Sequence, residues 1–251
     1  MPSPNRRAHR FSRAIGWEAV RANLRPALIL QGLMLALVLA YYWSPSIAAA
    51  LDALAEYKRA HGLLFVVGSA VLAASVAPEL FLVVFFQGGR VRRENFINLM
   101  FTAPLWAVDG ITVDMLYRGL ARFVGYEATF GVVATKICID QFGYNVLFAA
   151  PYGVIAYEWK NSGFSFEVLR RSLSFEYYRD KIVPTLLTTW AVWIPLVAMI
   201  YSLPLPVQFP LFSLALTFWV LLFTYITNRF AGKTEQPVLF TPAKAVAGGS
   251  Q

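Results

Sequence analysis

Charged residues are scarce in this sequence. Asp, Glu, Lys and Arg together make up 14% of its 251 residues, whereas hydrophobic residues make up 58%. Soluble domains carry about 25% charged residues, so this chain has too few polar groups to cover a surface that faces water. The composition argues against a soluble globular protein. It predicts an integral membrane protein, an all-α bundle of about six transmembrane helices.

Cysteine and histidine are scarcer still, and this limits the chemistry. Cys138 is the only cysteine, so the chain cannot form an intramolecular disulfide or a cysteine-based zinc site. Neither a zinc-binding helix nor a Ser-His-Asp triad can be composed from the two histidines, His9 and His61. We therefore expect no metal, no cofactor and no enzymatic activity. A membrane enzyme would need Glu79 and Asp140 to meet in a cavity large enough for a substrate.

Basic residues outnumber acidic ones, 22 to 14, for a formal net charge of +8. Membrane proteins collect Lys and Arg in the loops of their inner side, so we interpret the excess as a topology signal and expect no nucleic-acid partner. The basic tail, residues 1–25, is either a mitochondrial targeting segment or the anchor that holds the N-terminus inside. A targeting segment would place the protein in the mitochondrion, whereas in the inner membrane of a bacterium the same residues would hold the tail in the cytoplasm.

Six apolar runs predict membrane-spanning helices, at residues 26–43, 62–87, 95–116, 127–157, 183–203 and 209–227. The third run is the weakest, because Asp109 and Asp114 interrupt it. The second carries alanines at four-residue spacing, including Ala70 and Ala74, which would let another helix approach closely. The tail at residues 230–251 is polar and predicted to be disordered.

The loops between these runs agree with a count of six. Six spans place both termini on one side, together with the loops after the second and fourth spans, which are rich in Lys and Arg. The loops that contain Lys58 and Arg118 fall on the opposite side, which has fewer basic residues. This distribution is the one expected when the N-terminus stays inside.

Four polar residues within the predicted spans are candidates for a pore lining or a structural role: Lys136, Asp140, Gln141 and Glu79. A charge at the middle of a bilayer costs about 2.5 to 3.5 kcal/mol, so such groups should face a cavity or a partner. Lys136 and Asp140 are four residues apart and would share a helix face. They either wall a water-filled passage, with Gln141 beside them, or form an internal ion pair. Glu79 either lines a cavity or lies at the membrane interface.

Several elements in the second half of the chain have a familiar order: Tyr-Arg-Gly-Leu, TKICIDQFGYNVLFAAP, TLLTTWAVWIP and FWVLLFTYIT. Their distinctive positions are Tyr117, Lys136, Asp140, Gln141, Trp190, Trp193, Pro195, Trp219 and Tyr225. Over residues 117–229 this order resembles the Mpv-type family, whose other archetype is the twenty-two-kilodalton peroxisomal membrane protein. Spacing alone favours packing or interfacial anchoring for Trp190 and Trp193.

The resemblance implies a channel-like pore of low selectivity in an organellar membrane, either the mitochondrial inner membrane or another such as that of the peroxisome. Residues 117–229 would be its core and residues 26–116 additional N-terminal membrane helices. We expect the passage of small solutes or metabolites, with membrane lipids and a small-molecule solute as partners, and a homo-oligomer is compatible with this expectation. The alternative is a non-conducting membrane scaffold that organises partner proteins or lipids. Its basic inner loops would bind anionic headgroups, with about 1 kcal/mol from each Lys or Arg near the surface.

Overall fold

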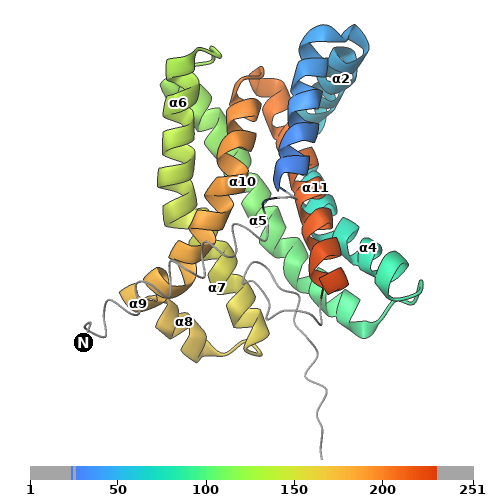
Figure 1. Ribbon diagram of the computed structural model, residues 1–251, viewed down its shortest axis with the longest axis vertical. Coiled ribbons are helices and arrows are strands. Elements are labelled where there is room, and N and C mark those ends of the chain that lie inside the picture. The colour runs from blue at the N-terminus through green and yellow to red at the C-terminus, as the bar shows by residue number, and fades with distance from the viewer. Residues whose placement is uncertain (1–23, 25–26, 231–251) are drawn as a thin grey trace, which may run out of the picture.

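The computed structural model describes residue 24 and residues 27–230, with side chains described as far as residue 221. Within these residues every regular element is a helix (Figure 1). The prediction of an all-α helical bundle is therefore confirmed. The predicted tails, 1–25 and 230–251, lie almost wholly outside the described residues.

The chain runs through a first helix, Ala27–Trp43, and then through the elements labelled in chain order. These are α2 (Pro45–His61), α3 (Leu63–Val71), η1 (Leu72–Val76), α4 (Ala77–Phe86), α5 (Arg93–Val124), α6 (Phe130–Cys138), η2 (Ile139–Ala149), α7 (Ala150–Asn161), α8 (Phe166–Ser172), α9 (Phe175–Tyr177), η3 (Tyr178–Ile182), α10 (Val183–Tyr201) and α11 (Leu205–Phe230). The three η segments are π-helical turns that continue the α-helices on either side of them.

Three of the described helices are long and apolar enough to cross a membrane: Leu63–Phe86, Arg93–Val124 and Phe175–Tyr201. A fourth candidate is the first helix together with α2, a pair that bends by 102°. The apolar helix Leu205–Leu221 is shorter. Length and composition thus support three or four spans within the described residues, and the count of about six stays a prediction.

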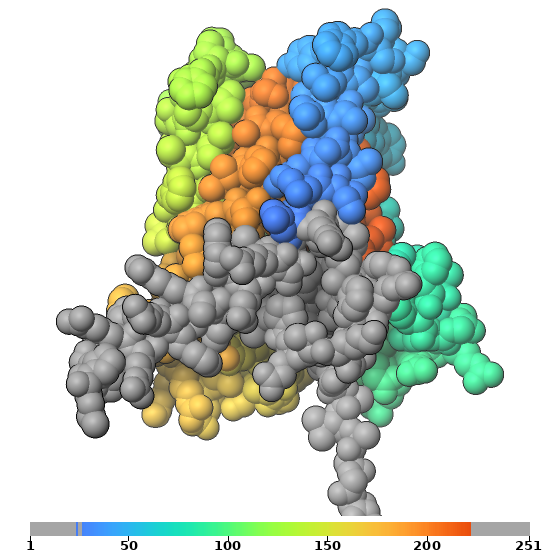
Figure 2. All heavy atoms as spheres, in the orientation of Figure 1, coloured from blue at the N-terminus to red at the C-terminus, as the bar shows by residue number. Residues whose placement is uncertain are grey.

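The first helix packs along α10. The side-chain amide of Gln31 donates hydrogen bonds to two backbone carbonyls of α10, at 3.1 and 3.2 Å. Near the other end of the helix, the Tyr42 hydroxyl donates to the carbonyl of Ser202 at 2.7 Å. Figure 2 shows the first helix, α10 and α6 in the upper part of one face of the molecule. The N-terminal helix is therefore an integral part of the bundle.

Helix α2 corrects the sequence prediction, which placed residues 44–61 in a loop because of their charges. Pro45 starts the helix, at a position where the missing N–H of proline costs no hydrogen bond. Leu51 and Ala55, four residues apart, share one helix face and are buried. Helix α2 contacts α11. This tertiary packing stabilises the segment as a helix, although its composition is typical of a loop.

Helices α3 and α5 approach each other very closely at Gly110. A Cβ atom on Gly110 would lie 2.6 Å from the Cβ of Ala70 and 3.3 Å from the carbonyl oxygen of Val66. The predicted close approach at the alanines of the second run is thus confirmed. Helix α5 also extends beyond the predicted 95–116 at both ends and continues through Pro104.

One core joins the two regions predicted from the sequence. Leu30 and Met34 of the first helix belong to the same buried cluster as Leu196 of α10 and Phe209 of α11. The predicted boundary between residues 26–116 and 117–229 falls inside α5, a single continuous helix. The described residues therefore form one packed unit across that boundary.

Two polar clusters lie near the two ends of α5. At one end Lys58 and Arg118 both contact Asp114, with N–O distances of 2.5 and 2.9 Å. Near the other end Asn95 and Asn98 contact Glu79 and Lys160, respectively. The structure thus brings Lys58 of α2 and Arg118 of α5 together on the Asp114 carboxylate, and the side of the membrane on which they lie stays a prediction.

Candidate solute cavity

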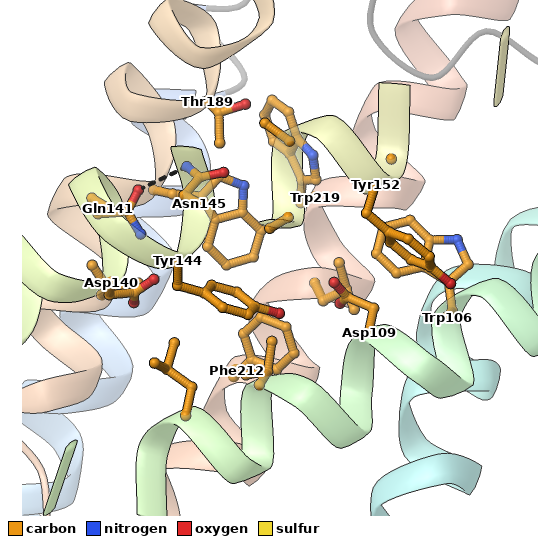
Figure 3. Close-up of a pocket in the computed structure, with 18 of the residues that line it drawn as sticks. Trp106, Asp109, Asp140, Gln141, Tyr144, Asn145, Tyr152, Thr189, Phe212 and Trp219 are labelled. Carbon is orange, nitrogen blue, oxygen red and sulfur yellow. Dashed lines mark hydrogen bonds between the residues drawn. The ribbon is translucent and has the colours of Figure 1, made fainter. Parts of the chain in front are cut away.

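A cavity of about 130 Å³ lies inside the bundle between α5, η2, α7, α10 and α11 (Figure 3). This volume is enough for several waters or for one small organic molecule. Its lining comprises Leu105, Trp106, Asp109, Val113, Leu116, Tyr117, Asp140, Gln141, Tyr144, Asn145, Ala149, Ala150, Tyr152, Gly153, Tyr157, Thr185, Thr189, Trp193, Val197, Phe212, Leu216 and Trp219. Most of these side chains are aromatic or aliphatic.

Two carboxylates from different elements reach this cavity. Asp140, in η2, is 5% exposed and accepts a hydrogen bond of 2.6 Å from the Tyr201 hydroxyl. Asp109, in α5, lies near Tyr144 and Tyr152 in Figure 3. Among the described side chains, none makes a hydrogen bond or ion pair with the Asp109 carboxylate. One carboxylate is therefore held by a protein donor, and the other faces the cavity without one.

Aromatic side chains form most of the wall around Asp109, and hydrogen bonds hold several of them. The Tyr144 hydroxyl lies 2.8 Å from Oγ1 of Thr112, and the Tyr152 hydroxyl donates to the carbonyl of Leu105 at 3.0 Å. The indole N–H of Trp106 donates to the hydroxyl of Tyr157, another lining residue, at 3.3 Å. Polar groups of these aromatic residues thus have protein partners. The hydrogen bonds hold the rings in their positions around the carboxylate.

The π-helical segment η2 supplies the polar side of the cavity. The Asn145 side-chain amide donates to Oε1 of Gln141 at 3.2 Å (Figure 3). The backbone carbonyl of Gln141 accepts a hydrogen bond of 2.9 Å from the indole of Trp190. A π-helix pairs each N–H with a carbonyl five residues earlier and is frequent at functional sites. Here it places Asp140, Gln141 and Asn145 together on the cavity.

Lys136 and Asp140 are both buried, but they do not form the predicted ion pair. None of the ion pairs between described residues includes Lys136, which does not line the cavity. Tyr201 lies between the two side chains, because its hydroxyl binds Asp140 and its ring centroid is 5.9 Å from Nζ of Lys136. The physical reason is tertiary: a tyrosine from α10 occupies the position where the pair would form, and the helix changes from α to π after Cys138.

Glu79 lies away from the cavity. Its carboxylate accepts a hydrogen bond of 2.7 Å from the side chain of Asn95, and Lys160 donates to the neighbouring Asn98 at 2.5 Å. Burial lowers the pKa of the Lys160 ammonium, and the Glu79 carboxylate opposes that shift. Glu79 therefore belongs to a polar cluster of α4, α5 and α7. Among the described contacts it does not meet Asp140.

The family-like positions have different places around the cavity. Tyr117, Trp193 and Trp219 line it directly. Trp190 contributes through its hydrogen bond to the carbonyl of Gln141. Pro195 lies inside α10, and the side chain of Tyr225 lies outside the described set.

Asp109 was not among the residues selected from the sequence, although of the two carboxylates at the cavity it is the one without a partner among the described side chains. Its signal was visible as a charge that interrupts an apolar run, which we interpreted as weakness of that span. An ionisable residue within a membrane segment is by default a functional candidate. The same signal also comes from Asp114, and only the structure separates the two.

Comparison of the chain with models of known families, with curated proteins and with solved structures finds no match in any of the three. The resemblance to the Mpv-type family therefore stays a prediction. The function must be argued from the cavity itself.

Proposed function

We propose that this protein is an integral membrane protein that forms a channel-like passage for small solutes through the cavity between α5, η2, α7, α10 and α11. The observation that carries the proposal is the presence of two carboxylates, Asp109 and Asp140, in an interior that is otherwise largely aromatic and aliphatic. Such groups are costly in a membrane protein and usually mark the path of an ion or a substrate. The cavity has the volume of a small solute.

The cavity also favours a passage over the alternative, a non-conducting scaffold that organises partner proteins or lipids. A scaffold would use its outer surface and its basic loops, and nothing in that role requires an interior polar space. Asp109 has no described protein partner that would explain it as a structural group. The residue order similar to the Mpv-type family supports the same proposal, and with it a location in a mitochondrial inner, other organellar or bacterial inner membrane.

Solute flux into liposomes tests this proposal. The full-length protein is reconstituted, and the release or uptake of small solutes of graded size and charge is followed, with protein-free liposomes as the blank. We expect a flux that depends on the protein and falls steeply once the solute exceeds the size of the cavity. Correctly inserted protein that leaves the liposomes tight would refute the passage and favour the scaffold.

A plug variant locates the route. Ala149→Trp places a large side chain in the cavity lining and should reduce flux by about tenfold or more, because a filled constriction blocks conduction. Leu147→Trp is the matched control, since Leu147 lies in the same segment η2 but is 80% exposed on the outside. Equal flux through both variants would show that solutes do not pass through this cavity.

A further inference from the structure

The charge of the cavity differs from that of the whole chain. The protein carries a formal net charge of +8, yet the ionisable side chains that line the cavity are carboxylates and tyrosines, without Lys, Arg or His among them. Lys136 does not line the cavity, and its Nζ lies 5.9 Å from the ring centroid of Tyr201. An anionic solute would therefore meet like charge in this space, whereas a cation would meet opposite charge.

Asp109 is the residue most in need of a positive partner. Asp140 has the hydroxyl of Tyr201 as a donor at 2.6 Å, and Asp114 has two basic side chains. No described side chain plays either role for Asp109. A carboxylate in a largely apolar wall is unfavourable unless water, a counter-charge or a donor compensates it, so a cationic ligand in the cavity would supply the counter-charge that the described side chains do not.

The wall around Asp109 selects the kind of cation. Aromatic rings attract cations to their faces, and cages of such rings bind alkylated ammonium groups. Trp106, Tyr144, Tyr152 and Trp219 all line this space (Figure 3). An inorganic cation would need several oxygen ligands to replace its water, as the hard cations of known sites do. The side-chain oxygens of Asp140, Gln141 and Tyr144 already have protein partners, so the lining suits a weakly hydrated organic cation better.

We propose that the cavity binds a small organic monocation, an alkylated ammonium compound, with the Asp109 carboxylate as its counter-charge and the surrounding aromatic rings as its cage. A cavity of about 130 Å³ suits a small member of this class. This assignment deepens the proposed function, because it names the class of solute that would pass. Binding can nevertheless be measured without transport, so the two proposals can fail separately.

The test is a titration of the purified full-length protein in lipid nanodiscs with tetramethylammonium, followed by tryptophan fluorescence and by calorimetry. The neutral tert-butanol, of similar shape, is the matched control ligand. We expect saturable binding of tetramethylammonium and binding of tert-butanol weaker by about tenfold or more, the difference that loss of a charge pairing produces. Absence of tetramethylammonium binding, or equal binding of the neutral compound, would overturn the assignment. Displacement by an equal concentration of sodium or potassium would also overturn it, in favour of an inorganic cation site.

Two pairs of variants connect the binding to the named residues. Asp109→Asn should weaken tetramethylammonium binding by about tenfold, whereas Glu56→Gln, which removes a carboxylate from the exposed surface of α2, should leave it unchanged. Tyr152→Leu should weaken binding by about fivefold through loss of a ring, whereas Tyr152→Phe should keep it. The tyrosine pair decides the matter if Asp109→Asn does not fold. Wild-type binding in both Asp109→Asn and Tyr152→Leu would refute the site.

The flux assay separates the two proposals. Binding of tetramethylammonium without any solute flux would leave the site standing and refute the passage. Flux of neutral solutes without binding of tetramethylammonium would leave the passage standing and refute the cation site.

Discussion

Asp109 and Asp114 are both aspartates of α5, yet their surroundings in the protein are opposite. Asp114 lies between Lys58 of α2 and Arg118 of α5, at 2.5 and 2.9 Å. Asp109 lies in a cavity wall among aromatic rings and has no described protein donor. Five residues of α-helix turn a side chain by about 140° around the axis, so the two carboxylates project in different directions from α5.

This contrast separates a carboxylate that stabilises the fold from one that is available to a ligand. Asp114 ties α2 to α5, and the Lys58 ammonium also lies 4.8 Å from the ring centroid of Phe209 in α11. Asp109 ties no two elements together by described contacts. Changes at the two positions should therefore affect different measurements, with stability at Asp114 and ligand binding at Asp109.

The largest effect on stability is expected for Asp114→Asn. The side chain of Lys58 is only 17% exposed, so loss of the carboxylate leaves a mostly buried ammonium without its counter-charge. Removal of one partner of a buried pair costs about 3 kcal/mol, which chemical unfolding of the detergent-solubilised protein would measure. Asp109→Asn is the matched control and should leave the free energy of unfolding unchanged or raise it, because it removes a charge that no described side chain compensates. Equal losses for the two variants would contradict the distinction drawn between them.

Gly110→Ala should destabilise the protein by about 2 kcal/mol, because the new Cβ would meet Ala70 at 2.6 Å and force α3 and α5 apart. Gly110 adjoins Asp109, so this variant tests whether the close packing of α5 against α3 keeps Asp109 and Asp114 in place. Gly119→Ala, at a position on the same helix where an added Cβ meets nothing within 4 Å, is the control. It should leave stability unchanged or raise it slightly. The same thermal melting temperature for both variants would show that the helix contact is looser than the structure indicates.

Tyr201→Phe removes the hydroxyl that donates to Asp140. Asp140 would then resemble Asp109, which accepts no hydrogen bond from a described tyrosine. The substitution removes a buried hydrogen bond of 2.6 Å to a carboxylate, and bonds to charged groups contribute about 1.5 to 3 kcal/mol. We expect a loss of about 1.5 kcal/mol in the free energy of unfolding. An unchanged stability would mean that Asp140 needs no donor from the protein, and the special status of Asp109 would then disappear.

The smallest effect is expected for Arg118→Gln. The Arg118 side chain is 64% exposed, and exposed ion pairs contribute about 0.5 kcal/mol or less. Lys58→Met should cost more, since it removes the less exposed of the two partners of Asp114. Chemical unfolding of both variants under the same conditions gives the order, and a larger loss for Arg118→Gln would reverse our assignment of the main partner.

The sequence was sufficient to predict the helices and some of the residues that line the cavity. Long apolar runs predict helices because lipid leaves the backbone no other way to satisfy its hydrogen bonds. Asp140 and Gln141 were selected as charged or polar residues within such a run, and the structure places both at the cavity. Helix α2 was missed because its charges outweigh its two buried positions in any local pattern.

The pairing of side chains could not be predicted from local spacing. The four-residue separation of Lys136 and Asp140 describes one helix in isolation, whereas Tyr201 arrives between them from α10. In the same way, Lys58 reaches Asp114 across a separation of 56 positions in the chain. Whether a carboxylate within a span is paired or available depends on such distant partners, and this is why Asp109 and Asp114 carried the same signal.

The length of η2 has a consequence for the geometry of the interior. If the same residues wound as an ordinary α-helix, α7 would rotate against α6 by about 100° for each extra residue that the π winding accommodates. Tyr152 and Gly153 would then turn away from the side of the bundle that Asp140 faces. The residue count of this one segment thus determines which side chains of the two flanking helices share an inner compartment.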